Sequence, residues 1–320
     1  MGRAEAGKDV CGTGNGVAMK NPKLTVIVVT YNSSGEIEAC LRSIRDTIET
    51  LSYELILVDN ASRDDSVDRS RRCFPGVIIV ANEENTGFPA ANNQALRRAR
   101  GEYVLLLNPD TVAHTGAIER LVATLEEHPE VGICGASLRD GEGIQAHDLR
   151  QLTFARMAIE ICGLDRFSPK FLPPERQEAV SGAAMIFRRS LASEIGLLDE
   201  QMFWGEDGDY CLRASQAGYA VWRAQSAVIT HFVGRSTIGN LAVYLRKQYT
   251  TRMRYIRKHG RPFEFWSMIP LFYLSLIMRT FKWYLYMVFS PSAEVFERLR
   301  TYHSLMLGLP SLFVEEARRD

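Results

Sequence analysis

Short apolar runs alternate with segments of helical spacing between residues 24 and 128, and this alternation constrains the fold more than any other feature. The apolar runs cover residues 24–30, 54–58, 77–80 and 103–107, and the helical segments cover residues 35–50, 66–73, 90–100 and 117–128. Continuous β-branched and apolar runs are typical of strands buried on both faces of a parallel sheet. The pattern predicts an α/β protein with a Rossmann-like, mostly parallel sheet flanked by helices.

The third helical segment ends at Gly101, which we interpret as a helix C-cap. The pattern is less regular over residues 131–234. It predicts a long loop region with short helices over 144–174, a strand over 180–188, a helix over 207–217, and two short strands over 219–224 and 227–230. We expect one domain over residues 23–240, with a first half of about 23–130 and a second half of about 131–240.

The chain carries 38 Lys and Arg residues and 38 Asp and Glu residues, so its formal net charge is zero, but the charges are distributed unevenly along the sequence. Residues 1–234 carry 24 basic and 32 acidic side chains, whereas residues 235–320 carry 14 basic and 6 acidic ones. The acidic main body argues against nucleic-acid binding. The basic end indicates an anionic partner, such as a membrane surface or a polyanion.

The basic end has two parts. Residues 241–261 combine a helical apolar stripe with seven cations and no acid, and residues 265–289 are almost all apolar or aromatic apart from Pro270, Arg279 and Lys282. The length fits a membrane span, but two cations near the middle are costly there, and we predict an interfacial helix pair instead. A buried helix hairpin is the alternative. We expect 241–320 to be a helical appendage that contacts a membrane or forms an oligomer.

The cysteines and the N-terminus indicate the compartment. None of the six cysteines forms a CxxC pair, so we expect reduced thiols in the cytosol. Residues 1–22 are Gly-rich and polar without the apolar core of a secretory signal, and we expect them to be disordered.

Polar residues follow three of the predicted strands at the point where each strand ends. They are Tyr31-Asn32, Asp59-Asn60 and Asn108-Pro109-Asp110. Any one of these clusters could simply make a turn. Because ligands bind at the carboxyl ends of parallel strands, three clusters on one sheet edge favour a binding site. A carboxylate at position 110 could hold a hard cation such as Mg²⁺ or Mn²⁺.

A second group of acids lies in Trp204-Gly205-Glu206-Asp207-Gly208-Asp209. Acids at a helix start can merely complement the helix dipole, and this explains Asp209 most naturally. One of the Glu206-Asp207 pair could serve as a general base. His231 follows a later β-like run and is a further candidate.

These motifs occur in an order that resembles the family 2 glycosyltransferases, within them the rhamnosyltransferase-like branch. The resemblance covers about residues 24–260, and the motifs are Thr30–Asn32, Val58–Ser62, Asn85–Phe88 with Ala91–Asn93, Leu107–Asp110, Ser181–Ala183, Asp199-Glu200 and Glu206–Arg213. It implies a GT-A fold and an inverting, metal-dependent transfer from a nucleoside-diphosphate sugar. The first half of the domain would bind this donor and the second half the acceptor.

The resemblance also implies a role for each matching residue. Nucleotide-sugar binding falls to Thr30, Tyr31, Asn32, Asp59, Asn60, Asn85, Gly87, Asn93 and Asn108. Acceptor binding falls to Gly182, Trp204 and Asp209. Asp207 would be the base, with Glu206 beside it, and Asp110 and His231 would bind Mg²⁺ or Mn²⁺. Asn108 stands where the family carries the first Asp of its Asp-x-Asp motif.

The leading hypothesis is a glycosyltransferase peripheral to the cytoplasmic face of the membrane, acting on a lipid-linked or cell-surface glycan. The branch suggests dTDP-rhamnose as donor, and UDP-galactofuranose, UDP-hexoses and GDP sugars remain open. A nucleotidyltransferase is one alternative, but the loop after the first strand lacks its phosphate-binding cation. A non-catalytic sugar-nucleotide-binding or glycan-binding protein is another, and it would not need the candidate base. A homo-oligomer fits the basic end as well.

Overall fold

The helices and strands of the computed structural model follow the predicted alternation. The structure describes residues 21–140, 143–144, 153–161, 175–202, 205–232 and 241–318, so residues 1–20 of the segment 1–22 that is predicted to be disordered lie outside the described residues. Pro22 is buried, and its carbonyl accepts a hydrogen bond from the Glu102 N–H, so the prediction does not hold at this residue. The strands are β1 Leu24–Thr30, β2 Tyr53–Asp59, β3 Ile78–Ala81, β4 Tyr103–Leu107, β5 Thr111–Ala113, β6 Val131–Asp140, β7 Gly143–Ile144, β8 Arg176–Gln177, β9 Ala184–Arg188 and β10 Ala220–His231. The helices are α1 Ile37–Thr47, α2 Ser66–Cys73, α3 Phe88–Leu96, α4 Ala117–Glu127, α5 Phe154–Ile161, α6 Arg189–Ile195, α7 Glu206–Gln216, α8 Leu241–His259, α9 Pro262–Phe289 and α10 Ala293–Ala317.

One sheet runs through the α/β part, in the order β3-β2-β1-β4-β9-β6-β10-β5, with β7 on β6 and β8 on β10. Strands β3, β2, β1 and β4 are mutually parallel, as predicted. Strand β9 lies antiparallel between β4 and β6, so the second half of the sheet is mixed. Because β9 runs in the opposite direction, it begins at the edge where β1, β2 and β4 end.

Alternate residues of β1 build two hydrophobic layers, one on each face of the sheet. Val26 and Val28 pack with α1 and α4, whereas Ile27 and Val29 pack with α3, α6 and α7. Every residue of β1 is buried. This explains why the strand is a continuous apolar run, since both of its faces are covered by helices.

The predicted strand pair at 219–230 is one strand, β10, with a register shift against β6 between Ala224 and Val228. The helix predicted over 207–217 is α7, Glu206–Gln216. The strand predicted over 180–188 is shorter, because residues 181–183 form a turn before β9.

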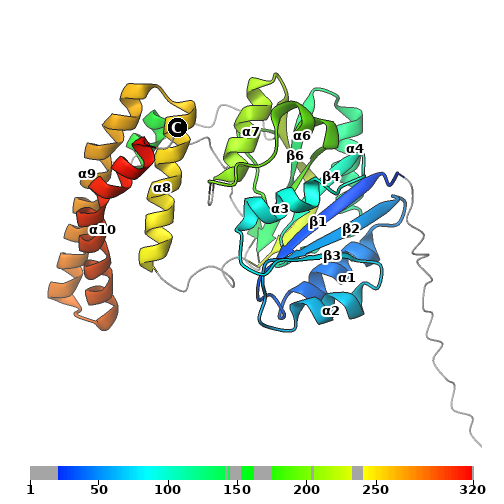
Figure 1. Cartoon of the computed structure of the whole chain (residues 1–320), viewed down its shortest axis with the longest axis horizontal. Helices are drawn as coiled ribbons and strands as arrows, with labels where there is room; N and C mark the ends of the chain where they lie inside the picture. The colour runs from blue at the N-terminus through cyan, green and yellow to red at the C-terminus, as the bar shows by residue number, and fades with distance from the viewer. Residues whose placement is uncertain are drawn as a thin grey trace, which may run out of the picture.

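The C-terminal helices α8, α9 and α10 pack on one another beside the α/β part (Figure 1). They share a core that includes Met253, Met268, Phe272 and Leu309, and Met157 of α5 joins it. Residues 265–289 belong to one helix, α9, with Pro270 inside it, and α8 precedes it, so residues 241–289 form a pair of helices. Their interfacial position stays a prediction. Among the helices of the described residues, none is both long enough and apolar enough to cross a membrane.

Gly101 is not a helix C-cap, because α3 already ends at Leu96. It lies instead against the backbone where β1 begins. A Cβ atom at position 101 would lie 2.4 Å from the Thr25 backbone nitrogen and 2.6 Å from the Leu24 carbonyl carbon. Close backbone approach therefore explains this glycine.

We expect Gly101→Ala to lower the free energy of unfolding by about 1–3 kcal/mol, because a buried central strand cannot move cheaply away from the new methyl group. Gly35→Ala is the matched control, since a Cβ there meets nothing within 4 Å. Urea unfolding of both variants measures the difference. Equal midpoints would contradict this view of Gly101.

Candidate active site

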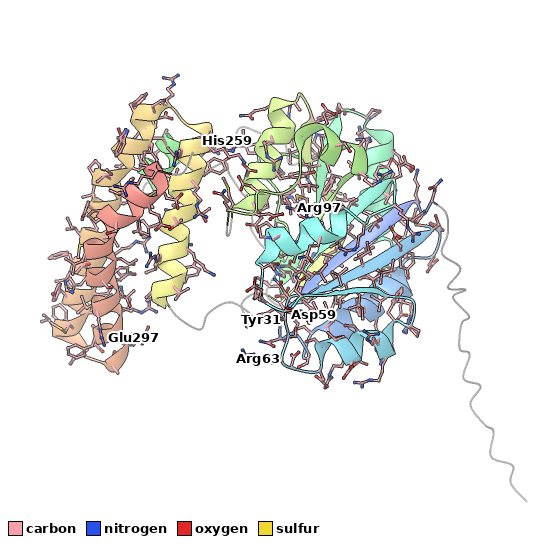
Figure 2. All side chains as sticks on the ribbon, viewed as in Figure 1. Tyr31, Asp59, Arg63, Arg97, His259 and Glu297 are labelled. Atoms are coloured by element: carbon pink, nitrogen blue, oxygen red, sulfur yellow. The ribbon has the colours of Figure 1, made fainter. Side chains whose placement is uncertain are left out.

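A cavity of about 310 Å³ lies at the carboxyl ends of β1, β2 and β4 and the start of β9. Figure 2 labels Tyr31 and Asp59 at this edge of the sheet. The cavity is lined by Val29, Tyr31, Ser33, Asn60, Asn85, Gly87, Phe88, Pro89, Asn108, Pro109, Asp110, Ser181, Gly182, Ala183, Glu206 and Asp207. The three polar clusters that follow the strands therefore contribute to one cavity, as the sequence predicted.

Asp207 stands in the first turn of α7, with its carboxylate against the turn before β9. Its Oδ2 accepts a hydrogen bond from the Gly182 backbone N–H at 3.1 Å, and its Oδ1 accepts one from the Gly208 N–H at 2.7 Å. A Cβ atom at Gly182 would lie 3.6 Å from the Asp207 Cβ, at van der Waals distance, so the turn before β9 packs closely against Asp207. Backbone N–H donors and the helix N-terminus both stabilise the ionised carboxylate, the form that accepts a proton.

Asp110 and His231 lie together at another corner, although 121 positions separate them in the sequence. Strand β5 pairs antiparallel with β10 and sets Thr111 opposite His231. The Asp110 Oδ1 lies 3.4 Å from His231 Nε2, and the Phe232 N–H donates to the Asp110 carbonyl at 2.9 Å. This pairing brings an imidazole beside Asp110, which lines the cavity, although His231 itself is not among the lining residues.

Two buried oxygens at this corner are suited to a hard cation. Asp110 Oδ1 and Asn108 Oδ1 are both buried and have no hydrogen-bond donor among the described residues. Carboxylate, amide and imidazole groups suit Mg²⁺ or Mn²⁺, which keep further positions for phosphate oxygens or water. The described residues hold no group of three or more His, Cys, Asp or Glu side chains placed to bind a metal. The donor set present therefore fits a metal only partly enclosed by protein.

Amide side chains build the wall beside β2. Asn60 donates from Nδ2 to Asn85 Oδ1 at 2.9 Å and accepts from the Thr86 N–H at 3.0 Å. Asn85 Oδ1 also accepts from the Gly87 N–H at 3.0 Å. Gly87 has φ +86°, which favours glycine, so the turn into α3 depends on this residue.

Two residues behind this wall are buried and polar. Thr30 and Asp59 end β1 and β2, and neither is among the lining residues. Asp59 Oδ2 accepts from the Ser62 N–H at 3.2 Å, whereas Asp59 Oδ1 and Thr30 Oγ1 are buried without a hydrogen-bond partner in the part of the chain that the structure describes. Unpaired buried oxygens are uncommon and are suited to receive a ligand group.

Asn32 and Ala61 hold the loops after β1 and β2 in an unusual backbone conformation. Their φ angles are 51° and 67°, in the left-handed region that non-glycine residues seldom adopt. Asn32 joins the two loops, because its Oδ1 accepts from the Arg63 N–H at 2.8 Å and its N–H donates to Ser62 Oγ at 2.9 Å. Asn32 thus shapes the loops and does not line the cavity.

Asn93 and Asp209 lie outside the cavity lining, and their binding roles stay predictions. Asn93 is buried and exchanges hydrogen bonds with the Leu198 backbone, 2.9 and 3.0 Å long, so it ties α3 to the chain before α7. Asp209 is fully buried in ion pairs outside the cavity lining. Trp204, predicted to bind the acceptor, lies outside the described residues.

Phe88 and Ser181 line the cavity but were not predicted as site residues. Each adjoins a predicted residue, since Phe88 follows Gly87 and Ser181 precedes Gly182. Both residues belong to short polar motifs between predicted helices and strands, and this position was the one sign in the sequence that they could belong to the site. A lone aromatic or serine carries no chemical signature of its own, so the motif alone could not assign them.

Comparison with known proteins identifies the family. Residues 25–196 match the model of the family described as "Glycosyl transferase family 2". The chain belongs to this family. It is therefore a glycosyltransferase, and the expected enzyme class is confirmed.

Two curated relatives align with most of the chain. The N-acetylglucosaminyl-diphospho-decaprenol L-rhamnosyltransferase of Mycobacterium tuberculosis is 26% identical over 254 residues, which is 71% of this chain and 82% of the relative. The uncharacterized glycosyltransferase YwdF of Bacillus subtilis is 29% identical over 248 residues, covering 74% and 84%.

Solved structures confirm the GT-A fold. The mannosyltransferase PcManGT from Pyrobaculum calidifontis, in complex with GDP-Man and Mn²⁺, aligns with a TM-score of 0.56 at 18% identity, covering 93% of this chain and 86% of the other. GalNAc-T7 with UDP, GalNAc and Mn²⁺ aligns with a TM-score of 0.57 at 16% identity, covering 74% and 48%. The fold class is thus a mixed sheet flanked by helices, followed by C-terminal helices.

Proposed function

We propose that this family 2 glycosyltransferase moves a sugar from a nucleoside diphosphate to a hydroxyl group of a lipid-linked glycan, with inversion at the anomeric carbon. The observation that carries the proposal is the cavity, which joins a carboxylate base candidate, Asp207, to the Asp110–His231 corner. We propose dTDP-rhamnose as the first donor to test and a polyprenyl-diphosphate-linked sugar as the first acceptor. The rhamnosyltransferase relative, named for a decaprenol-linked acceptor, supports both choices.

The charge of the cavity supports a metal-assisted reaction. Its described lining carries three carboxylates, on Asp110, Glu206 and Asp207, and neither lysine nor arginine. A diphosphate entering this cavity meets like charge, so it needs a counter-ion. Asp110 and His231 would hold Mg²⁺ or Mn²⁺, and the bound ion would supply positive charge to the leaving diphosphate.

The donor's nucleoside would lie along the Asn60–Asn85 wall, with Tyr31 at the rim. Tyr31 is 43% exposed, and its ring offers an apolar face to a base. Asp59 would accept from the ring N–H of a pyrimidine, because its buried Oδ1 has no donor among the described residues. Thymine and uracil both present such an N–H, so this contact fits dTDP and UDP donors alike.

Asp207 would take the proton from the acceptor hydroxyl as its oxygen attacks the anomeric carbon. The new C–O bond forms on one face of the sugar while the bond to the diphosphate breaks on the other, so one displacement inverts the configuration. The Gly182 N–H holds the carboxylate in place during this step. Glu206 bonds the Gly205 N–H at 3.0 Å and would order the turn that presents Asp207.

Two other functions fit the cavity less well. A nucleotidyltransferase would need a cation near the nucleotide phosphates, and the described lining has none. A non-catalytic binder would not need a carboxylate held by two backbone N–H groups at the cavity corner. Binding without turnover, by purified protein with a membrane extract as acceptor, would favour the binder.

We expect Asp207→Asn to lower the transfer rate by about 10²–10⁴-fold while donor binding persists, because the amide keeps the shape but cannot accept the proton. Mass spectrometry of nucleoside diphosphate release and of the glycosylated lipid, over a panel of nucleotide sugars, measures the rate. Asp68→Asn, an exposed carboxylate on α2, is the matched control. A normal rate in Asp207→Asn would exclude this residue as the base.

We also propose that the protein lies on an anionic membrane at the cytoplasmic face, where such an acceptor would be anchored. The outward side of α9 exposes apolar and aromatic side chains, which here we call the α9 face: Phe263, Trp266, Leu274, Ile277, Met278, Phe281, Leu285 and Val288. Arg279 and Lys282 are also exposed on α9, with Lys282 at the flank of this face. Apolar groups beside cations complement an anionic lipid surface, whereas a large bare apolar surface is costly in water.

We expect the wild-type protein to float with vesicles of mixed neutral and anionic phospholipid, and to keep part of this binding in high salt because apolar burial is not screened. The double variant Ile277→Ser/Phe281→Ser should lose about 10-fold or more of the affinity. Val243→Ser, exposed on α8, is the control. Protein that stays at the bottom and is monomeric without detergent would reject the membrane contact; a defined dimer would assign the α9 face to an oligomer.

A further inference from the structure

The first turn of α7 is joined to the helical region by a buried carboxylate. Asp209 has no exposed surface. Its Oδ2 lies 2.9 Å from Arg213 Nε within α7, and its Oδ1 lies 2.7 Å from both Lys258 Nζ and His259 Nε2 of α8. Figure 2 shows His259 at the junction between α8 and the α/β part. The helix that carries the candidate base therefore depends on cations from a segment fifty positions further along the chain.

The contact is fixed from both sides. Lys258 also reaches Asp199 Oδ2 at 2.6 Å, in the chain that leads into α7. The ring of His259 packs on Tyr255 at 4.9 Å, and Tyr255 lies 4.0 Å from the Cβ position of Gly208. Helix α8 thus contacts the first turn of α7 at the residue between the two aspartates.

Arg213 alone leaves Asp209 incompletely paired. Arg213 also donates to the backbone carbonyls of Ile195 at 2.5 Å and Leu197 at 2.8 Å, so its guanidinium is shared among three acceptors. Burial by itself would raise the pKa of Asp209, but the hydrogen bonds from His259 and Lys258, together with the charges of Arg213 and Lys258, lower it to about 2. An ionised carboxylate without exposed surface is tolerated only when it is paired, and Lys258 and His259 complete the pairing to which Arg213 also contributes.

Asp207 and Asp209 point to opposite sides of the same helical turn. Successive residues are 100° apart around a helix, so residues two apart diverge by about 200°. Asp207 faces the cavity and Gly182, and Asp209 faces α8. Because both residues belong to one helical turn, the ion pairs that hold Asp209 against α8 also hold the orientation of Asp207.

We propose that Lys258 and His259 are positioning residues for the transfer reaction: they hold the first turn of α7 through Asp209 and thereby keep the Asp207 carboxylate against Gly182. The proposal rests on the proposed role of Asp207. Under this proposal, the C-terminal helices support the catalytic residue Asp207 in addition to their proposed contact with the membrane. Neither residue touches the cavity lining.

The test compares Lys258→Met/His259→Ala with Glu316→Gln. Glu316 is a second buried carboxylate of the helical region, paired with Arg254 across α8 and α10 at 2.9 Å. Arg254 also donates to the Gln201 carbonyl in the chain before α7, and Glu316→Gln leaves this donor in place. We expect the double variant to lower kcat by about 10- to 100-fold with little change in donor KM, because small misplacements of a reacting group cost this much. Glu316→Gln should lower thermal stability but leave kcat within about 2-fold.

Conservative variants and a direct structural measurement make the test specific. His259→Gln keeps a donor toward Asp209 and should recover most of kcat. Hydrogen exchange of the α7 amides should accelerate in the double variant and not in Glu316→Gln. If the double variant does not fold, Lys258→Met alone serves the same test, because Arg213 and His259 still pair with Asp209.

The positioning role would be overturned if the double variant kept the wild-type kcat. It would also be overturned if the fold-loss of kcat in the double variant were no larger than that in Glu316→Gln. Asp207→Asn assayed in parallel separates this outcome from a failure of the proposed base. If Asp207→Asn is inactive and the double variant is fully active, only the positioning role fails. If Asp207→Asn is fully active, the proposed base is wrong and the positioning role falls with it.

Discussion

The negative charge of the cavity lining is the constraint on which the site depends, because it would repel the diphosphate of the donor that we propose. Three carboxylates line the described part of the cavity, and no lysine or arginine accompanies them. The fold separates these acids into two corners. Asp110 is brought to His231 by the antiparallel pairing of β5 and β10, and Asp207 is brought to Gly182 by α7 and the turn before β9. The corner at Asp110 is suited to bind a cation, and the carboxylate at the other corner, Asp207, is suited to accept a proton. Negative charge would therefore have a different role at each corner.

Under the two proposals for the C-terminal helices, the helical region would connect this chemistry to the acceptor. Its inner side is a shared core of α8, α9 and α10, and its outer side is the α9 face. Its contact with the α/β part passes through Lys258 and His259 to the turn that carries Asp207. If both proposals hold, the surface that meets the lipid and the side chains that hold the base belong to one packed unit. The predicted boundary near residue 240 then separates two segments of sequence but not two functions.

Local features of the sequence predicted the parallel half of the sheet and most of the cavity. The runs at β1, β2 and β4 are apolar because both faces are covered, and polar residues follow them because the strands end at one edge. Long-range pairing could not be predicted in this way. The reversal of β9, the packing of Gly101 on β1 and the burial of Asp209 each depend on a partner distant in the sequence. Asp209 illustrates this best, since its neighbours resemble a catalytic cluster while its partners lie in α8.

Calorimetric titration of a nucleoside diphosphate, dTDP or UDP, with and without Mn²⁺ tests the electrostatic constraint most directly. We expect binding with Mn²⁺, and binding weaker by about 100-fold or more when EDTA is in excess, because the diphosphate then meets the carboxylates without a counter-ion. Asp110→Ala should behave in Mn²⁺ as the wild-type protein does in EDTA, and Asp68→Asn should bind normally. Equal affinity with Mn²⁺ and with EDTA would contradict the view that this cavity needs a divalent cation to accept its donor.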